Sequence, residues 1–156
     1  MILNNKHIEI LEALQQYRFL TTKQFVQIGI FNTEKQARDK YLSLMKRKRN
    51  PPIKALDFGV VAGKGKLAQI HHLTQCGAEI LADLQGVELE KIRYPAGKVQ
   101  FSRDYFHRVE FISLHIALGQ YAKRTGQAVD FFHSYFDSTG NQRPVSYTHL
   151  TLPTKA

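Results

Sequence analysis

The sequence predicts a mainly α-helical protein that contains one small β-hairpin. Several segments repeat apolar residues at the three- and four-residue spacing of an amphipathic helix. Two of the expected helix starts carry a Thr-x-x-Gln capping box, which satisfies free N–H groups in a first helical turn. The runs IKALDFGVV and KLAQIHHL suit strands, and the glycine-rich spacer AGKG between them predicts a hairpin turn.

Two helices are predicted near the N-terminus. Residues 5–17 repeat apolar side chains at i, i+4 and i+7 from Ile10, and the asparagine pair at the start of this segment can cap the helix. A short second helix is expected to begin at the capping box formed by Thr21 and Gln24. Gly29 is a natural terminator for it, because glycine adopts the left-handed conformation that often ends a helix.

A third helix is predicted after a second capping box, formed by Thr33 and Gln36, and Pro51 and Pro52 prevent its continuation. Its apolar stripe is expected to consist of Ala37, Tyr41, Leu44 and Met45. Its opposite face is polar and comprises Lys35, Gln36, Asp39, Ser43 and Lys46, with Arg38 at the margin. We therefore expect one face of this helix to be buried and the other to be solvated.

The segment LTQCGAEILADLQG, which follows the hairpin, predicts a fourth helix. Thr74 can cap this helix, and Gly86 can end it. Its packing residues are predicted to be Ile80, Leu81 and Leu84. Residues 87–101 show no clear period, so we interpret them as a connector.

A long helix is predicted from about Arg103 to Arg124, with Ser102 as its cap and Gly126 as its stop. One apolar stripe consists of Tyr105, Val109, Ile112 and Ile116, and a second consists of Leu114, Leu118 and Tyr121. A helix that is apolar on two sides is expected to be buried on both or to pair with another chain. The aromatic-rich segment AVDFFHSYFDSTG that follows is typical of a strand and a turn.

The positive charge of the chain is concentrated in one segment. The formal net charge is +9, and the segment from Lys35 to Lys66 holds ten Lys and Arg residues against two acids, Asp39 and Asp57. Charge that is focused in this way attracts a polyanion and raises its encounter rate. A solvated face that keeps the protein soluble is the alternative interpretation.

The order of helix, short helix, amphipathic helix and lysine-tipped hairpin is that of a winged helix-turn-helix, here followed by a long helix and a strand as an α+β remainder. On this interpretation the third helix enters the major groove of double-stranded DNA. The residues predicted to face the groove are Lys35, Gln36, Arg38, Asp39 and Ser43. The residues predicted to bind phosphates are Lys46, Arg47, Lys48, Arg49, Lys64 and Lys66.

The predicted domain organisation has four parts. A winged helix-turn-helix over residues 1–86 is followed by the connector at 87–101. Residues 102–144 hold the long helix and the strand, which are either a dimerising element or the start of a truncated second domain. The last twelve residues, VSYTHLTLPTKA at 145–156, resemble translated sequencing-adapter read-through. We therefore expect a non-native tail, and a native chain that continues beyond Arg143.

Four stretches of the sequence carry a resemblance to a known family. They are FLTTKQF, QARDKYLSLMKRK, IHHLTQCGAEIL with its Leu-Thr-x-x-Gly pattern, and HRVEFISLHIALGQYAKRTGQ. Together they resemble the replication-relaxation family of winged-helix proteins of plasmids and other mobile elements, over most of residues 5–137. The resemblance implies a non-catalytic DNA-binding protein that acts in replication, DNA relaxation, mobilisation or their transcriptional control. A relaxase or a replication protein is the partner that it implies.

Metal chemistry has weak support in the sequence. His107 and Glu110 are three residues apart on the long helix and could share one metal ion. Cys76 and His133 are the other obvious ligands, but neither C-x-x-C nor H-x-x-x-H spacing occurs. Packing or surface histidines are the simpler interpretation, and we predict neither a metal nor a cofactor.

Two alternative functions stay open. A metal-dependent nuclease would use Glu110, Asp130 and Asp137 with Mg²⁺, in which case the chain is the N-terminal part of such an enzyme. Winged helices also serve as protein-docking modules, and the helix at 103–124 could form a homodimer seam. Salt dependence separates DNA binding from protein docking, because phosphate contacts weaken steeply as salt rises.

Cellular location follows from what the sequence lacks. Cys76 is the single cysteine, which excludes an internal disulfide and fits a reducing compartment. No stretch approaches the roughly 20 apolar residues that a membrane span needs. We therefore predict a cytoplasmic protein that does not contact the membrane.

Overall fold

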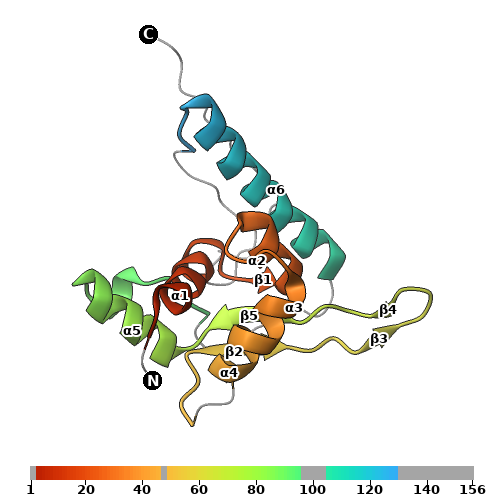
Figure 1. Ribbon diagram of the computed structural model, residues 1–156, viewed down its shortest axis with the longest axis horizontal. Coiled ribbons are helices and arrows are strands. Elements are labelled where there is room, and N and C mark those ends of the chain that lie inside the picture. The colour runs from red at the N-terminus through yellow and green to blue at the C-terminus, as the bar shows by residue number, and fades with distance from the viewer. Residues whose placement is uncertain (1–2, 47–48, 96–104, 130–156) are drawn as a thin grey trace, which may run out of the picture. The chain divides into compact units, whose positions relative to one another are not determined.

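The computed structural model of the protein describes residues 3–46, 49–95 and 105–129. The chain divides into two compact units, Met1–Val109 and Glu110–Ala156. The first unit combines helices with small antiparallel sheets, and the described part of the second unit is largely helical (Figure 1). The mixed but mostly helical class predicted from the sequence is therefore confirmed. Among the described helices, none has the length and apolar character needed to span a bilayer.

The first two helices have the bounds that their capping residues predict. Helix α1 (Asn5–Tyr17) is capped by Asn4, and helix α2 (Thr22–Ile28) follows the short strand β1 (Leu20–Thr21). The amide of Gln24 donates to the Thr21 hydroxyl at 3.2 Å, and the amide of Thr21 donates to the Gln24 side chain at 2.9 Å. Gly29 ends α2 in the left-handed conformation with φ of 94°.

The third helix begins as predicted, but its middle is wider than a regular α-helix. It consists of α3 (Glu34–Gln36), the π-helical segment η1 (Ala37–Leu42) and α4 (Ser43–Lys46). Thr33 caps it by accepting a bond from the Gln36 amide at 3.2 Å. The Ser43 amide donates to the carbonyl of Arg38, five residues back, which is the hydrogen bond of a π-turn.

The π-turn changes which side chains of the third helix are buried. Ala37, Leu42 and Met45 are fully buried, whereas Leu44 is 51% exposed. The predicted stripe assumed a regular α-helix and placed Leu44 in the core, which is wrong. A π-turn holds more residues than an α-turn. For this reason Leu42, five residues after Ala37, faces inward, and Leu44, seven residues after Ala37, does not.

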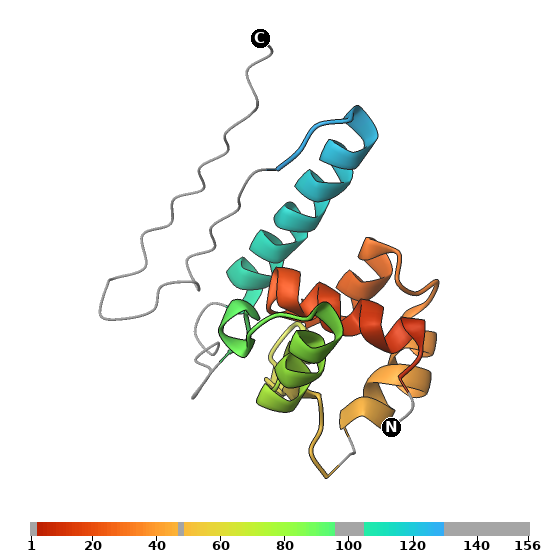
Figure 2. The ribbon, with the colours of Figure 1, turned by 90° about the vertical axis from the view of Figure 1, so that its left-hand side faces the viewer.

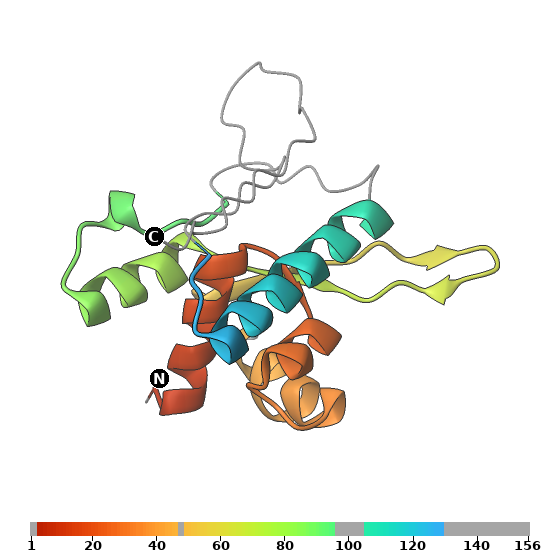
Figure 3. The same ribbon diagram turned by 90° about the horizontal axis from the view of Figure 1, so that it is seen from above.

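Two small sheets follow the third helix. Strands β2 (Ile53–Leu56) and β5 (Ile70–Leu73) pair antiparallel, and β1 adds to the other edge of β5, which gives the order β1-β5-β2. Strands β3 (Val60–Val61) and β4 (Gly65–Lys66) form the second sheet. Figures 1 and 3 show this β3–β4 hairpin projecting away from the larger sheet.

Helix α5 (Gln75–Gln85) comes next and lies beside α1 (Figure 2). The side-chain amides of Gln15 and Gln85 bond to one another across the two helices at 2.9 Å. Leu81 is buried as predicted, but Leu84 is exposed, and the alanines of α5 face the core in its place. A short 3₁₀ turn, η2 (Leu89–Lys91), lies within the predicted connector.

The turn after the third helix docks against the first residues of α5. The Thr74 hydroxyl donates to the carbonyl of Pro51 at 2.6 Å, and it accepts a bond from the Gly77 amide at 3.2 Å. A Cβ atom on Gly77 would overlap the carbonyl oxygen of Pro52. The Leu-Thr-x-x-Gly pattern therefore has a structural role here, because its threonine caps α5 and its glycine lets the turn approach.

The core of the first unit lies between the helices and the three-stranded sheet. Its large, fully buried side chains are Ile10, Leu11, Leu14, Leu20, Phe25, Leu42, Met45, Ile53, Ile70, Leu73 and Leu81. They come from α1, α2, the third helix, the sheet and α5, so each of these elements contributes its apolar face to one core.

Helix α6 (Tyr105–Thr125) begins in the first unit and continues into the second. Ile112 and Ile116 of its first apolar stripe are buried, whereas Leu114 and Tyr121 of its second stripe are 46% and 51% exposed. The second stripe is therefore partly exposed in the single chain, and the predicted alternative, pairing with another chain, stays a prediction. The predicted Ser102 cap, most of the predicted strand and the tail lie outside the described residues.

Candidate nucleic-acid interface

The third helix presents an exposed polar face in the first unit. Lys35, Gln36, Arg38 and Asp39 are exposed, and Ser43 is half-buried. Arg38 donates from Nε to the Asp39 carboxylate at 3.0 Å, and both side chains are more than half exposed. An exposed ion pair of this kind contributes little to stability. Arg38 can therefore exchange this carboxylate for a phosphate or a base edge.

Two lysines outside the predicted site, Lys40 and Lys54, add to the exposed charge. Lys40 is exposed on the third helix. In a regular α-helix it would follow Ala37 by three residues and lie next to the apolar stripe, which is why the helical period did not select it. Lys54 is exposed on β2 directly after the buried Ile53. Strand alternation could have identified it, because neighbouring residues of a strand face opposite sides.

A polar bridge joins the end of the third helix to the base of the hairpin. The Lys46 ammonium donates to the side-chain oxygen of Gln69 at 3.0 Å. The amide nitrogen of Gln69 donates in turn to the Asp57 carboxylate at 3.1 Å. Asp57 precedes β3, and Gln69 directly precedes β5. We call these three residues, Lys46, Gln69 and Asp57, the helix–hairpin bridge.

Asp57 is the charged anchor of this bridge. Its other carboxylate oxygen, Oδ1, accepts a bond from the Gly59 amide at 2.8 Å. The Lys66 ammonium lies 4.0 Å from Oδ2, the oxygen that Gln69 bonds. The bond from Gly59, followed by that from Gln69, holds the pKa of Asp57 below its usual value. Asp57 therefore stays ionised at neutral pH, and it partly offsets the charge of the surrounding lysines.

The hairpin carries the other two described lysines of the predicted site. Lys64 lies in the turn between Gly63 and Gly65, which both have positive φ angles, and Lys66 lies on β4. Both lysines are exposed. The ammonium of Lys64 lies 3.7 Å from the centroid of the Phe106 ring. The predicted phosphate contact at Lys64 therefore has an aromatic neighbour that the sequence did not indicate.

The first turn of α6 packs against the hairpin arms. The Tyr105 hydroxyl donates to the carbonyl of Ala68 at 2.8 Å, and the rings of Tyr105 and Phe58 are 4.9 Å apart. On the other side, the Gln24 side chain donates to the carbonyl of Val109 at 2.9 Å. These contacts fix the start of α6 beside both α2 and the hairpin.

The remaining predicted contacts lie between the third helix and β2. Arg49 is exposed, whereas Arg47 and Lys48 lie outside the described residues. The structure therefore places the predicted groove-facing residues and four of the predicted phosphate contacts, Lys46, Arg49, Lys64 and Lys66, in one compact unit. The bridging role of Gln69 and Asp57 was not predicted, because only cationic and groove-facing polar residues indicate DNA contacts in a sequence.

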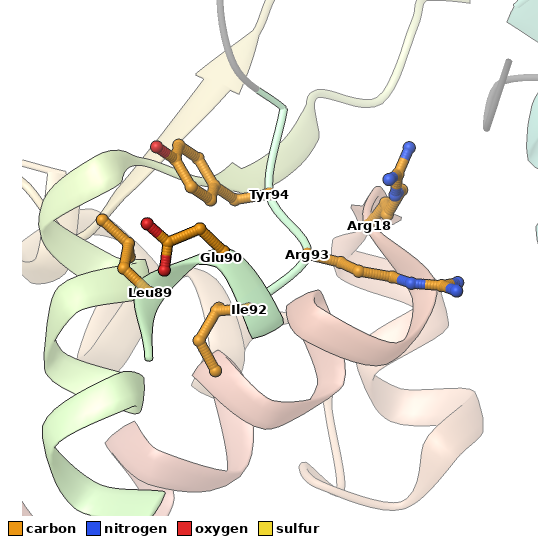
Figure 4. A pocket seen from close by; sticks show the side chains of 6 residues that line it. All are labelled: Arg18, Leu89, Glu90, Ile92, Arg93 and Tyr94. Carbon is orange, nitrogen blue, oxygen red and sulfur yellow. The ribbon is translucent and has the colours of Figure 1, made fainter. Parts of the chain in front are cut away.

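A cavity of about 340 Å³ lies elsewhere in the first unit (Figure 4). Its lining residues are Arg18, Leu89, Glu90, Ile92, Arg93 and Tyr94. Figure 4 shows the two arginine side chains extending on one side of the cavity and Glu90 and Tyr94 lying together on the other. The lining combines two arginines, a glutamate and a tyrosine with two apolar side chains.

The adjacent histidines of β5 belong to the core. His71 and His72 are both buried and bond through Nδ1 to the carbonyls of Leu20, at 3.2 Å, and Leu73, at 2.8 Å. Because a carbonyl only accepts, Nδ1 carries the proton in both rings. Burial lowers the pKa of His71 to about 4 and also lowers the pKa of His72.

Some of the candidates for metal and nuclease chemistry lie in the described part of the chain. Within the described residues, no three or more His, Cys, Asp or Glu side chains form a group that could hold a metal ion. His107 and Glu110 are exposed on α6. His133, Asp130 and Asp137 lie outside the described residues, so the nuclease alternative stays a prediction.

Comparisons of the chain with protein-family models, with curated proteins and with solved structures find no significant match. The resemblance to the replication-relaxation family therefore stays a prediction that depends on the four sequence stretches. The functional inference depends instead on the chemistry of the third helix, the hairpin and the bridge between them.

Proposed function

We propose that the first unit is a winged helix-turn-helix that binds double-stranded DNA and catalyses no reaction. The order α1, β1, α2, third helix and hairpin supports this assignment, as does a three-stranded antiparallel sheet of order β1-β5-β2. In this proposal the third helix is the recognition helix, and the β3–β4 hairpin is the wing. The protein would serve replication, relaxation or mobilisation of a plasmid or other mobile element, as the family resemblance implies.

The observation that carries the proposal is the helix–hairpin bridge. Lys46 and Asp57 belong to the two elements that hold the excess charge, and Gln69 bonds to both at 3.0 and 3.1 Å. The bridge therefore sets how the exposed cations of the helix lie relative to those of the hairpin. A fixed pair of basic elements suits a rigid duplex, whereas cations that only solvate the protein need no such connection.

The proposed roles follow the sequence prediction, and exposure supports them for the described residues other than Ser43 and Lys46, which are half-buried. Lys35, Gln36, Arg38, Asp39 and Ser43 would face the major groove, where arginine, lysine and glutamine pair with base edges. Lys46, Arg47, Lys48, Arg49, Lys64 and Lys66 would bind phosphates, to which we add Lys40 and Lys54 because both are exposed in the same unit.

The test is binding to random-sequence duplex DNA at several salt concentrations, followed by fluorescence anisotropy. We expect the logarithm of affinity to fall linearly with the logarithm of salt concentration, with a slope of about −0.9 per phosphate contact. The double variant Lys64→Ala, Lys66→Ala should weaken binding to all sequences about equally and should reduce the slope by about 2. The double variant Lys91→Ala, Lys123→Ala removes the same charge from exposed positions elsewhere and should change the slope far less.

Two outcomes would count against the proposal. Affinity that barely responds to salt would favour the protein-docking alternative, since docking does not release counterions from phosphates. A change of sequence preference in the Lys64 and Lys66 variant, at unchanged average affinity, would contradict the phosphate role of the hairpin.

Homodimerisation through α6 is a second part of the proposal. Leu114 and Tyr121 are about half exposed on this helix, and their burial against a second copy would remove apolar surface from water. A relaxase or a replication protein as partner, and a cytoplasmic location, complete the proposal. Both follow from the family resemblance and the composition.

A further inference from the structure

We propose that Phe106 and Lys64 form a binding site for an unpaired nucleotide of single-stranded DNA that adjoins the bound duplex. The base would stack on the Phe106 ring, and Lys64 would bind the phosphate of the same strand. This inference rests on the proposed function, because the hairpin that carries Lys64 is the proposed wing. It adds a second class of ligand, since duplex contacts alone give no role to an exposed aromatic ring.

The exposure of Phe106 is the first observation that supports this site. Phe106 is 41% exposed, whereas the neighbouring Tyr105 is only 9% exposed. The two rings meet edge to face at 5.2 Å, and Tyr105 is held by its bond to the carbonyl of Ala68 at 2.8 Å. The buried ring therefore braces the exposed one. A braced and exposed ring is a suitable stacking platform for a base.

The position of Lys64 is the second observation. Its ammonium lies 3.7 Å from the centroid of the Phe106 ring. Lys64 belongs to the hairpin turn and Phe106 to α6, so the fold brings together two residues that are distant in the sequence. A lysine over an exposed ring gains less from that contact than a base gains by stacking there. When Lys64 binds a phosphate at the end of the duplex, its ammonium leaves the ring, and the ring then accepts the unpaired base that follows on the same strand. Positive charge next to an aromatic platform is the combination that binds single strands.

The ligand must be unpaired because of how bases are arranged in a duplex. Each base inside a duplex is covered on both faces by its neighbours, so a ring that approaches the duplex from the side can stack only on an unpaired base. The site lies next to the hairpin arms, and Tyr105 also contacts Phe58 there at 4.9 Å. A strand leaving a duplex held by the hairpin lysines would therefore meet Phe106 first. The simpler alternative is an aromatic residue that only packs at a helix start.

The experiment compares the full chain on three probes: a short blunt-ended duplex, and the same duplex with a thymidine overhang on either the 5′ or the 3′ strand. We expect the wild-type protein to bind one overhang about tenfold more tightly than the blunt duplex, which is the gain typical of one stacked base. Phe106→Leu keeps an apolar side chain but removes the stacking face, so it should abolish this gain. Phe106→Tyr keeps the face and should retain the gain.

Binding to the blunt duplex serves as the internal control, because it should be the same for the wild type and for both Phe106 variants. Equal wild-type affinity for all three probes, or a gain that persists in Phe106→Leu, would overturn the inference and leave the duplex proposal intact. Absence of salt-dependent binding to the blunt duplex would instead overturn the proposed function, and this inference with it. A 2-aminopurine base in the overhang should change its fluorescence on binding to the wild type and not to Phe106→Leu.

Discussion

Gly77 occupies a position in α5 where no other residue fits. Its missing side chain leaves room for the carbonyl of Pro52, which also accepts a bond from the Thr74 amide at 3.1 Å. Glycine in a helix costs about 1 kcal/mol relative to alanine, so the propensity of α5 alone would favour alanine here. The tertiary contact outweighs that preference, because the overlap involves a backbone atom that cannot move without breaking its own bond.

The variant Gly77→Ala should therefore destabilise the protein although alanine is the better helix former. We expect the free energy of unfolding to fall by about 2 kcal/mol, since overpacking against a rigid neighbour typically costs about 1–3 kcal/mol. Urea denaturation followed by circular dichroism measures it. Glu79→Ala, on the exposed side of α5, should change stability by no more than about 0.5 kcal/mol. A Gly77→Ala protein that is more stable than the wild type would contradict the close approach.

His71 links stability to pH. Its folded pKa of about 4 lies below the ordinary value of 6.5 because the ring is buried beside Phe25, with ring centroids 6.1 Å apart. The unfolded chain therefore binds a proton more readily than the folded one. The contribution of neutral His71 to the free energy of unfolding is therefore fully present above pH 6.5, and it is lost as the pH falls to about 4.

We expect the free energy of unfolding to fall by about 2 kcal/mol from this residue as the pH is lowered from 7 to 5. Urea denaturation at both pH values measures the fall. In His71→Gln the fall should be smaller by about that amount. Part of the slope should remain, because burial lowers the pKa of His72 as well. An unchanged pH dependence in His71→Gln would show that another group controls it.

At the level of elements, the third helix and the hairpin are separate in sequence and joined in space. The bridging residues Lys46 and Gln69 are 23 positions apart. The bridge is partly exposed, so it contributes little to global stability. Its effect should instead be on geometry, because it limits how the hairpin moves relative to the helix.

Gln69→Ala tests this distinction between stability and geometry. It removes both bonds of the bridge, so we expect duplex affinity to fall about three- to tenfold while the free energy of unfolding changes by less than about 1 kcal/mol. Anisotropy titration and urea denaturation measure the two effects. Gln75→Ala is the matched control, because its side chain bonds to Glu79 of the same helix at 2.8 Å. Affinities that are equal for the two variants would remove the bridge from the DNA-binding proposal.

At the level of the whole molecule, α6 presents an apolar row that a single chain leaves exposed. Leu114 and Tyr121 are seven residues apart and therefore lie on the same side of the helix, about two turns from one another. Large apolar side chains that repeat at this spacing are typical of a helix that pairs with another.

The double variant Leu114→Glu, Tyr121→Glu should convert a dimer into a monomer. Each large apolar side chain contributes about 1.5–3 kcal/mol when it is fully buried, so we expect the dimer dissociation constant to rise more than tenfold. Sedimentation velocity over a range of concentrations measures this shift. Lys123→Glu, on another side of the helix, should leave the dimer intact. A wild-type protein that is monomeric at every concentration would refute the seam.

Local signals in the sequence were sufficient to set the ends of several helices. Asn4, Thr21 and Thr74 cap α1, α2 and α5, and Gly29 and Gly86 end two of them in the left-handed conformation. These residues act through bonds to amides and carbonyls within one helical turn, so no distant contact is needed. The concentration of positive charge between Lys35 and Lys66 is likewise a property of the sequence alone.

Contacts between distant residues decided the rest. The π-turn buries Leu42 and leaves Leu44 exposed. A regular α-helical period would have placed Leu44 in the core instead. The helix–hairpin bridge and the meeting of Phe106 with Lys64 join residues that no sequence period relates. Capping depends on neighbours along the chain, whereas packing and long-range hydrogen bonds depend on which surfaces the fold brings together. For that reason the helix ends and the basic character followed from the sequence, and the arrangement of the candidate interface required the tertiary structure.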